Sequence, residues 1–326
     1  MADLQLLTRR RALALGAAAV ITPTSAWSQS YPTKLIRVFA SAAPGGGTET
    51  SGRLVSDYLG TYLKSPVVCE AKPGAGGMLG AQLVTRAEPD GYTLLYCAAS
   101  AITVGPNLVA DAPFNTLTDL APINAIGQSP LAVALSPRLG IRSLPDFLKA
   151  ASTRELTLGH AGIGTLAHLT IELLAKATGG KIRQVPYKGG GPAVVDVLGG
   201  HIDGTVSDMP ALYAQFQAGE LVPIAITSDK RSEMMADVPA ISEALPGFSA
   251  PVWYGLYAPA KTSPAIVQQM SDAIKTIAGN DDLKARLTTL GIEYRPFPSP
   301  AEFRTFIAGE FNRWGKFIKE NNIREG

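Results

Sequence analysis

Apolar and polar positions in the first third of the chain follow two alternating patterns. Short apolar runs at 35–39, 67–70 and 92–97 predict strands. Between them, apolar residues recur at helical spacing over 48–63 and 78–86, which predicts two helices. Strands and helices that alternate in this way form parallel sheets with right-handed crossovers. We therefore expect a β-α-β-α-β unit at the start of the fold.

The alternation returns in the middle of the chain. Two strand segments at 123–126 and 131–135 suggest the first crossing between two lobes. Ser143, followed by Pro145, predicts a capped helix start, and Gly179 with the next glycine predicts a helix end. The strands predicted here are 156–160, 183–187, 204–207 and 222–227, and the helices are 165–178, one that ends near 198 and one that ends near 219.

The last third predicts a return to the first lobe. Residues 252–257 form an apolar, aromatic strand, and residues 281–290 a helix. Ser263 and Ser299, each followed by proline, predict two further helix starts, and the last helix runs to about residue 320. A chain of 326 residues is long enough for two lobes. We expect lobe 1 to comprise residues 29–128 and 229–326, and lobe 2 to comprise residues 129–228.

Glycine-rich turns follow three of the predicted strands, around residues 44–47, 73–77 and 162–165. The second and third each lead from a strand toward a helix, as the first does. A helix N-terminus has unpaired N–H groups and favours an anion, while glycine lets backbone approach a ligand. In open α/β sheets, ligands bind beyond the carboxyl ends of the strands. The ligand-binding candidates from these turns are Ala43, Pro44, Gly45, Gly46, Gly74, Ala75, Gly76, Gly162, Gly164 and Thr165.

The N-terminal segment 1–28 resembles an export signal. It has a basic part at Arg9, Arg10 and Arg11, an apolar part over 12–21, and small residues before a cleavage position at Gln29. The paired arginines are compatible with the twin-arginine route, and the general secretion route stays open. A disordered basic tail is the alternative. We expect a periplasmic protein.

Charge makes some partners improbable. Removing the three arginines and one aspartate of the signal from the 29 basic and 27 acidic residues leaves 26 of each. A neutral mature chain argues against nucleic acid, which prefers a basic face. An anionic ligand must then be met by local dipoles and a few side chains.

The two cysteines, Cys69 and Cys97, fall at the ends of predicted strands. If the strand at 35–39 lies between their strands, two strand spacings of about 4.8 Å each separate them. That is beyond the ~7 Å limit between the Cα atoms of a disulfide. We predict two free, buried thiols.

Seven short motifs in order along the mature chain carry a resemblance. They are Pro44-Gly45-Gly46-Gly47 with Arg53, Pro73-Gly74-Ala75-Gly76-Gly77, Pro89-Asp90-Gly91-Tyr92-Thr93-Leu94-Leu95, Gly162 to Thr165 with His168, Val185-Pro186-Tyr187-Lys188-Gly189, Val238-Pro239, and Trp253-Tyr254-Gly255-Leu256 with Ala258-Pro259. With them the chain resembles the substrate-binding proteins of tripartite tricarboxylate transporters, the Bug-type periplasmic receptors. The resemblance covers nearly the whole mature chain.

The resemblance implies an α/β fold of the two-lobed periplasmic-binding-protein type (type II, or Venus flytrap), each lobe a mostly parallel sheet flanked by helices. It implies a receptor that closes on a small carboxylate and delivers it to a membrane permease of one large and one small subunit. The family commonly has aspartate where this chain has Glu49, whose longer side chain can reach toward the cleft. A monomer suits a receptor that docks to a permease.

Several side chains have two open interpretations. Thr165 either donates to a ligand carboxylate or caps its own helix. His168 either faces the cleft or packs inside the lobe. Tyr187 follows a strand and can line the cleft. Asp208 either binds a ligand amine or braces a neighbouring loop. For Arg53 we favour a salt bridge to a nearby acid over ligand contact.

Catalysis, cofactors and metals find little support. The glycine-rich run 74–80 lacks the dinucleotide spacing, because Leu79 stands where the third glycine is required. The sequence has no G-x-S-x-G elbow and no P-loop lysine. The three histidines lack the paired spacing of a zinc site. We expect a non-catalytic receptor. The alternative is a sensor subunit that presents the bound carboxylate to a membrane kinase.

Overall fold

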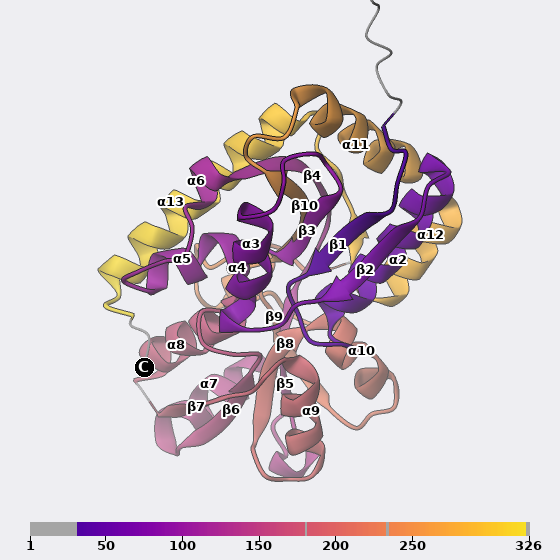
Figure 1. The fold of residues 1–326 in the computed structure, drawn as a ribbon. Helices are drawn as coiled ribbons and strands as arrows, with labels where there is room; N and C mark the ends of the chain where they lie inside the picture. Colours follow the sequence, from indigo (N-terminus) through magenta and orange to yellow (C-terminus); the bar gives the residue numbers. More distant parts are fainter. Residues whose placement is uncertain (1–30, 180, 233–234, 324–326) are drawn as a thin grey trace, which may run out of the picture.

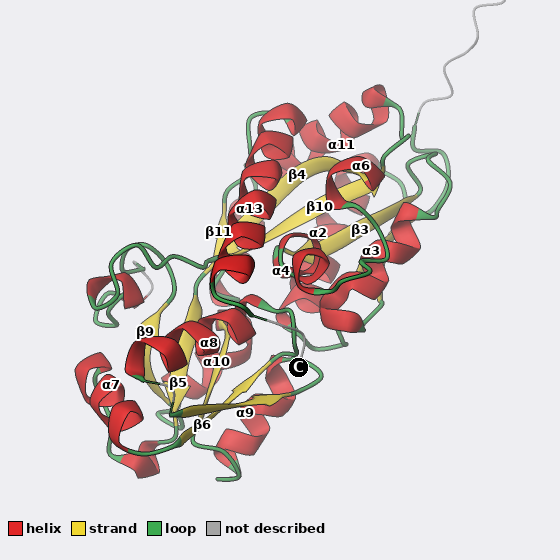
Figure 2. Cartoon of the chain, turned by 90° about the vertical axis from the view of Figure 1, so that its left-hand side faces the viewer, coloured by secondary structure: helices red, strands yellow, loops and turns green. Residues whose placement is uncertain are grey.

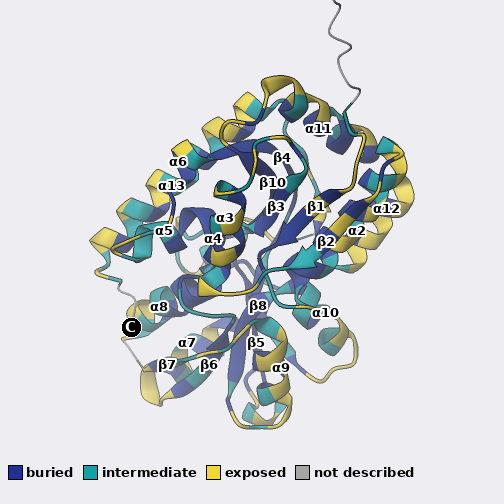
Figure 3. Ribbon diagram, in the orientation of Figure 1, coloured by how far each residue is buried: buried dark blue, intermediate teal, exposed yellow. Residues whose placement is uncertain are grey.

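The computed structural model describes residues 31–179, 181–232 and 235–323. The predicted export signal therefore lies outside the described residues. Two lobes, each built on one sheet with helices on its faces, lie one above the other in Figure 1 and side by side in Figure 2. Helix faces that point outward are exposed, whereas the strands are largely buried (Figure 3).

The first lobe contains a six-stranded sheet in the order β11-β4-β10-β3-β1-β2. Its first elements are β1 (Ile36–Ala40), α2 (Gly47–Leu63), β2 (Val67–Ala71), η1 (Ala75–Gly77), α3 (Met78–Thr85), β3 (Thr93–Ala98), α4 (Ser100–Thr103), α5 (Gly105–Leu108), α6 (Thr116–Asp119) and β4 (Leu120–Ser129). The later ones are β10 (Val252–Pro259), α11 (Pro264–Ile277), α12 (Asp281–Thr289), β11 (Glu293–Tyr294) and α13 (Pro300–Glu320).

The second lobe contains a five-stranded sheet in the order β7-β6-β8-β5-β9. Its elements are β5 (Leu131–Leu135), η2 (Pro137–Leu139), α7 (Leu144–Thr153), β6 (Leu156–His160), α8 (Leu166–Thr178), β7 (Ile182–Pro186), α9 (Gly190–Leu198), β8 (Gly204–Asp208), α10 (Met209–Gln217) and β9 (Val222–Ile226). The connection back to the first lobe contains η4 (Ile241–Glu243).

Both sheets are mixed. The predicted β-α-β-α-β unit is present, and β1 pairs in parallel with β2 and β3. Antiparallel pairs occur where the chain enters or leaves a lobe, at β10 with β3 and β4 and at β5 with β8 and β9. The parallel strands leave their carboxyl ends, with the glycine turns, on the side of each lobe that faces the other.

The chain crosses between the lobes at Pro130. Strand β4 ends at Ser129, which is paired with Val252 in the first sheet, and β5 begins at Leu131, which is paired with Asp208 in the second. The return crossing is tied to the first by Thr227, whose Oγ1 accepts a hydrogen bond from the N–H of Leu131 and donates to the carbonyl of Ala250. The two crossings therefore run together.

Local signals in the sequence are confirmed at several helix ends. The Ser143 hydroxyl accepts a hydrogen bond from the N–H of Asp146 at the start of α7, and Ser299 does the same for Glu302 at α13. Gly179 adopts the left-handed conformation at the end of α8, with φ of 87°. Ser263 precedes Pro264 of α11 as predicted, but its side chain makes no cap hydrogen bond.

The two cysteines are free and buried, as predicted. Strand β1 lies between β2, which carries Cys69, and β3, which carries Cys97. This strand order is the one on which the prediction depended. In the part of the chain that the structure describes, none of the helices combines the length and the apolar character needed to cross a bilayer.

Candidate functional site

The glycine turns of the two lobes contact each other across the space between the sheets. Gly76 of η1 has φ of 62°, and a Cβ placed on it would lie 2.9 Å from the carbonyl oxygen of Ile163 in the other lobe. Gly164, with φ of 79°, would carry a Cβ only 3.6 Å from the Cα of Gly105. Because both contacts use the missing side chain, glycine at Gly76 allows the lobes to approach this closely.

A cavity of about 190 Å³ lies at this junction. Its walls come from both lobes and combine backbone of the glycine turns with apolar side chains. The lining residues are Ala75, Gly76, Met78, Gly105, Leu108, Val109, Ile163 and Gly164. A pocket with apolar walls and a few backbone polar groups suits a small ligand with one polar end.

The second-lobe turn is held by its own polar contacts. The hydroxyl of Thr165 donates to the carbonyl of Gly162 at 2.7 Å and accepts from the N–H of His168 at 3.3 Å. Thr165 is thus the cap of α8. Its hydrogen is used by Gly162, so a ligand at this hydroxyl would meet a remaining lone pair.

Two buried histidines support this turn from inside the lobe. Nδ1 of His160 lies 2.9 Å from the carbonyl oxygen of Gly162, so its N–H donates there. Nδ1 of His168 accepts from the N–H of Gly164 at 3.4 Å, and its Nε2 lies 3.8 Å from a carboxylate oxygen of Glu172. Burial lowers the pKa of both imidazoles, that of His168 to about 4. Both rings are therefore neutral near pH 7, and the polar atoms of His168 are directed into its own lobe.

The first-lobe turn at 43–47 leads into α2. The N–H of Gly46 donates to the carbonyl of Ala43, and Pro44 and Gly45 are exposed. The buried carboxylate of Glu49 accepts from the N–H of Gly45 at 3.1 Å and forms a salt bridge with Arg53. The salt bridge that we favoured for Arg53 is confirmed. Glu49 folds back onto its own turn.

A second contact between the lobes involves Asp208, the last residue of β8. The Tyr254 hydroxyl of β10 donates to Oδ2 of Asp208 at 3.3 Å. A Cβ on Gly47, the first residue of α2, would collide with the same oxygen. Tyr254 is buried and stacks on Tyr96 with centroids 6.2 Å apart. Asp208 thus lies where α2 of the first lobe meets the second.

Tyr187 is directed within its own lobe. Its hydroxyl donates to Asp196 of α9 at 2.6 Å, and its N–H donates to the carbonyl of His160. Partial burial and the Asp196 carboxylate raise the pKa of this phenol to about 12. The ring edge approaches Gly159, where a Cβ would lie 3.1 Å away.

The structure brings only some of the sequence-predicted residues to one cavity. Ala75, Gly76 and Gly164 line it. Gly74 and Gly162 flank the same turns, with φ of 139° and 130°. Ala43 through Gly46 and Asp208 lie along the junction at α2. The remaining lining residues, Leu108, Val109 and Met78, were not predicted, because the segment 99–119 carries no strong periodicity.

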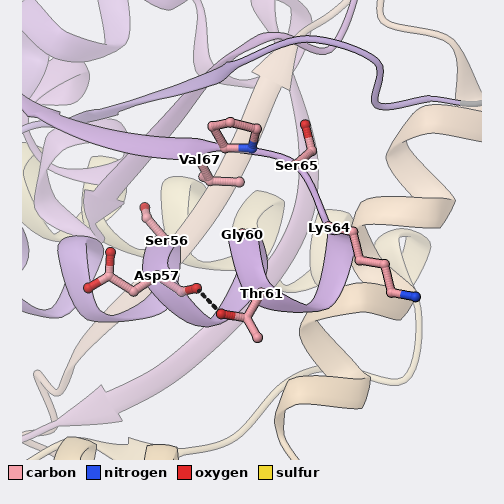
Figure 4. A pocket seen from close by; sticks show the side chains of 8 residues that line it. Ser56, Asp57, Gly60, Thr61, Lys64, Ser65 and Val67 are labelled. Atoms are coloured by element: carbon pink, nitrogen blue, oxygen red, sulfur yellow. Dashed lines mark hydrogen bonds between the residues drawn. The ribbon is translucent and has the colours of Figure 1, made fainter.

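A larger depression of about 410 Å³ lies elsewhere, at the C-terminal end of α2. Figure 4 shows it beside Ser56, Asp57, Thr61 and Lys64, with the Thr61 hydroxyl donating to the carbonyl of Asp57. The C-terminal end of a helix disfavours an anion. None of the glycine turns borders this depression, so it is a poor candidate for the ligand site. Within the described residues, no three of the His, Cys, Asp and Glu side chains are placed to hold a metal ion.

Comparisons with known proteins agree with this architecture. Residues 52–323 match the family described as the tripartite tricarboxylate transporter family receptor. Protein BugT of Bordetella pertussis is 33% identical over 318 residues, which cover 95% of each chain. The structure of Rpa4515 from R. palustris with adipate has a TM-score of 0.85 at 28% identity, covering 90% of this chain and 99% of that one. MatC from Rhodopseudomonas palustris with bound malate has a TM-score of 0.82 at 27% identity, covering 88% and 100%.

These matches confirm the two-lobed periplasmic-binding-protein fold that the sequence predicted. The family match spans most of the chain, and the relative in Bordetella pertussis aligns with nearly all of it. The chain therefore belongs to the tripartite tricarboxylate transporter receptors, a family of solute-binding receptors rather than of enzymes.

Proposed function

We propose that this chain is a periplasmic receptor that captures a small organic carboxylate between its two lobes and delivers it to a tripartite tricarboxylate-type permease. The observation that carries the proposal is the cavity between Gly76 of the first lobe and Gly164 of the second. Two relatives of the same fold hold adipate and malate. The chemistry of this chain is compatible with such ligands, because its glycine turns present backbone N–H groups at helix starts.

The proposed mechanism is a shift between open and closed lobes. A ligand that contacts both turns binds the closed form more tightly than the open form and so increases its population. The permease, with its large and small subunits, then recognises the closed receptor. In this mechanism the receptor acts as a monomer, and no cofactor takes part.

The lobe boundaries and site residues belong to the same proposal. Lobe 1 comprises residues 29–128 and 229–326, and lobe 2 comprises 129–228. The crossing at Pro130 and the return after β9 support this division. The predicted export signal at 1–28 would deliver the chain to the periplasm.

A thermal-shift screen of the purified chain tests the proposal. Small carboxylates are compared with neutral analogues of the same size, such as amides. A carboxylate at ~100 times its Kd should stabilise the fold by about 2.7 kcal/mol, a shift of several degrees. Shifts with carboxylates alone support the receptor function. Shifts with neutral analogues alone, or with neither class, contradict it.

A further inference from the structure

The side chain of Asp208 is not used by its own helix. Asp208 occupies the N-cap position of α10, where aspartate is among the preferred capping residues. It nevertheless makes no cap hydrogen bond. The carboxyl group turns instead toward the first lobe, where it meets Gly47 and the hydroxyl of Tyr254.

The surroundings of Asp208 leave its carboxyl group short of donors and of positive charge. Among the described residues, no lysine, arginine or histidine forms an ion pair with it. The side-chain donor is Tyr254, at the long distance of 3.3 Å. An ionised carboxylate has about four acceptor positions on its two oxygens. Asp208 is half-buried, so part of it stays accessible from the junction between the lobes.

A second polar group beside Asp208 also lacks a partner. The Ser207 hydroxyl is buried and, within the described part of the chain, has no hydrogen-bond partner. Oδ1 of Asp208 would lie 3.5 Å from a Cβ on Gly190, and the Ser207 hydroxyl would collide with that same Cβ. Both groups thus lie against the first residue of α9. Buried polar groups are normally satisfied, so two under-satisfied neighbours indicate an absent partner.

The chemistry of that partner follows from what is lacking. A hydroxyl would add a hydrogen bond but would not compensate the charge of a carboxylate in a desolvated site. A second carboxylate would be repelled by an ionised Asp208. An ammonium group supplies three donors and a positive charge together. The glycine turns of the same junction remain available for the carboxylate of the same ligand.

We propose that Asp208 selects ligands that carry an ammonium group beside their carboxylate, namely amino acids, and disfavours plain dicarboxylates. This inference rests on the proposed function, since it names the class of carboxylate that the receptor takes. Tyr254 orients the Asp208 carboxyl from the other lobe, so the selection operates when the lobes close.

The test uses matched probe pairs that differ only in the amino group: L-aspartate against succinate, and L-glutamate against glutarate. Calorimetry with the wild-type chain should give at least about tenfold tighter binding for one amino acid than for its desamino partner. Asp208→Asn should weaken that amino acid by about tenfold or more and reduce the discrimination. Asp111→Asn, an equal charge change at an exposed position, should leave both affinities unchanged.

The pH dependence gives a readout that does not need a variant. Burial raises the pKa of Asp208, and Tyr254 is the titratable group that faces it from β10, while α2 and α9 present Gly47 and Gly190. Binding of an ammonium by ionised Asp208 strengthens as the pH rises through this pKa. A protonated Asp208 that donates to a second carboxylate would instead bind dicarboxylates more tightly as the pH falls.

The outcomes separate this inference from the proposed function. Preference for the amino acid, lost in Asp208→Asn, supports it. Equal or tighter binding of succinate or glutarate, or a dicarboxylate affinity that rises at low pH, overturns the ammonium selection and leaves the receptor function standing. Equal binding of the preferred amino acid by wild type and Asp208→Asn shows a brace between the lobes and also overturns it. If the broader carboxylate screen also gives no binding, both proposals fail together.

Discussion

The imidazole rings of His160 and His168 stack behind the second-lobe glycine turn, with centroids 5.2 Å apart and 27° between their planes. One ring contacts the backbone of Gly162 and the other that of Gly164, so together they fix the turn from inside. Neither ring can accept a proton without placing a charge in this buried position.

Acid should therefore destabilise the fold. Burial lowers the folded-state pKa of His168 from 6.5 to about 4, so the unfolded chain binds more protons between these values. The free energy of unfolding should be fully supported above pH 6.5 and fall by about 2 kcal/mol between pH 7 and pH 5. His160 acts in the same direction, while Glu172, whose pKa is raised by burial, partly offsets the change.

Urea unfolding at several pH values measures this effect. His168→Asn keeps an acceptor for the N–H of Gly164 and removes the titration, so its stability should depend less on pH. His201→Gln changes an exposed histidine and should retain the wild-type slope. A wild-type stability that is flat from pH 7 to pH 5 would exclude this role of the histidine pair.

Removal of the Thr165 hydroxyl should weaken ligand binding. In Thr165→Ala the carbonyl of Gly162 loses a donor and α8 loses its cap, which costs about 0.5–2 kcal/mol of stability and loosens the turn. Calorimetry should show a higher Kd. Ser143→Ala removes the cap of α7 and serves as the matched control, with a similar loss of stability and an unchanged Kd. An unchanged Kd in Thr165→Ala would remove this turn from the site.

A methyl group at Gly76 should obstruct closure. The added Cβ meets the carbonyl oxygen of Ile163 across the junction. Gly140→Ala is an unusually close control, because Gly140 has φ of 69° and open space around its Cβ position, so both changes share the left-handed backbone cost of about 1–2 kcal/mol. Gly76→Ala should lose about tenfold in affinity, and its small-angle scattering should show less ligand-induced compaction. Equal behaviour of the two variants would contradict closure through this contact.

Neutralisation of Glu49 should favour anionic ligands. Glu49→Gln keeps an acceptor for the N–H of Gly45 but removes a negative charge from the first turn of α2, where the helix favours anions. We expect the affinity for a bound carboxylate to rise by about three- to tenfold at low salt. Glu302→Gln makes the same change in the first turn of α13. A decrease in affinity specific to Glu49→Gln would show that the charge supports the site.

Both thiols should be inert in the folded chain. Burial raises the pKa of Cys97 strongly and that of Cys69 to about 11, so neither forms the reactive thiolate near pH 7. Ellman's reagent should label neither residue in native buffer and both in denaturant. Rapid native labelling would show that β2 or β3 opens readily.

The sequence predicts local features of this protein better than its long-range contacts. Ser143, Thr165 and Ser299 were identifiable as caps because a cap depends on residues within three positions. The order of β2, β1 and β3 followed from a general rule about parallel sheets. The short strand β11 was missed, because its two residues have no periodicity to detect.

Contacts between the lobes could not be predicted in this way. The approach of Tyr254 to Asp208 joins positions 46 residues apart on different sheets, and no spacing in the sequence encodes it. Glu49 was expected to reach toward the cleft, and its contacts with Gly45 and Arg53 became visible only with the conformation of the turn. The histidine stack has a detectable signal, since a strand end and the first turn of the next helix commonly face each other.

Pro130 gives the molecule a mechanical property. A proline has no N–H, so the backbone donates no ladder hydrogen bond at the point where one sheet hands the chain to the other. Rotation about this residue can change the angle between the lobes while Ser129 keeps Val252 and Leu131 keeps Asp208 as partners. The energy of opening is then set by the surfaces that separate, not by the strands that bend, so a few contacts at the junction are enough to decide which state the receptor occupies.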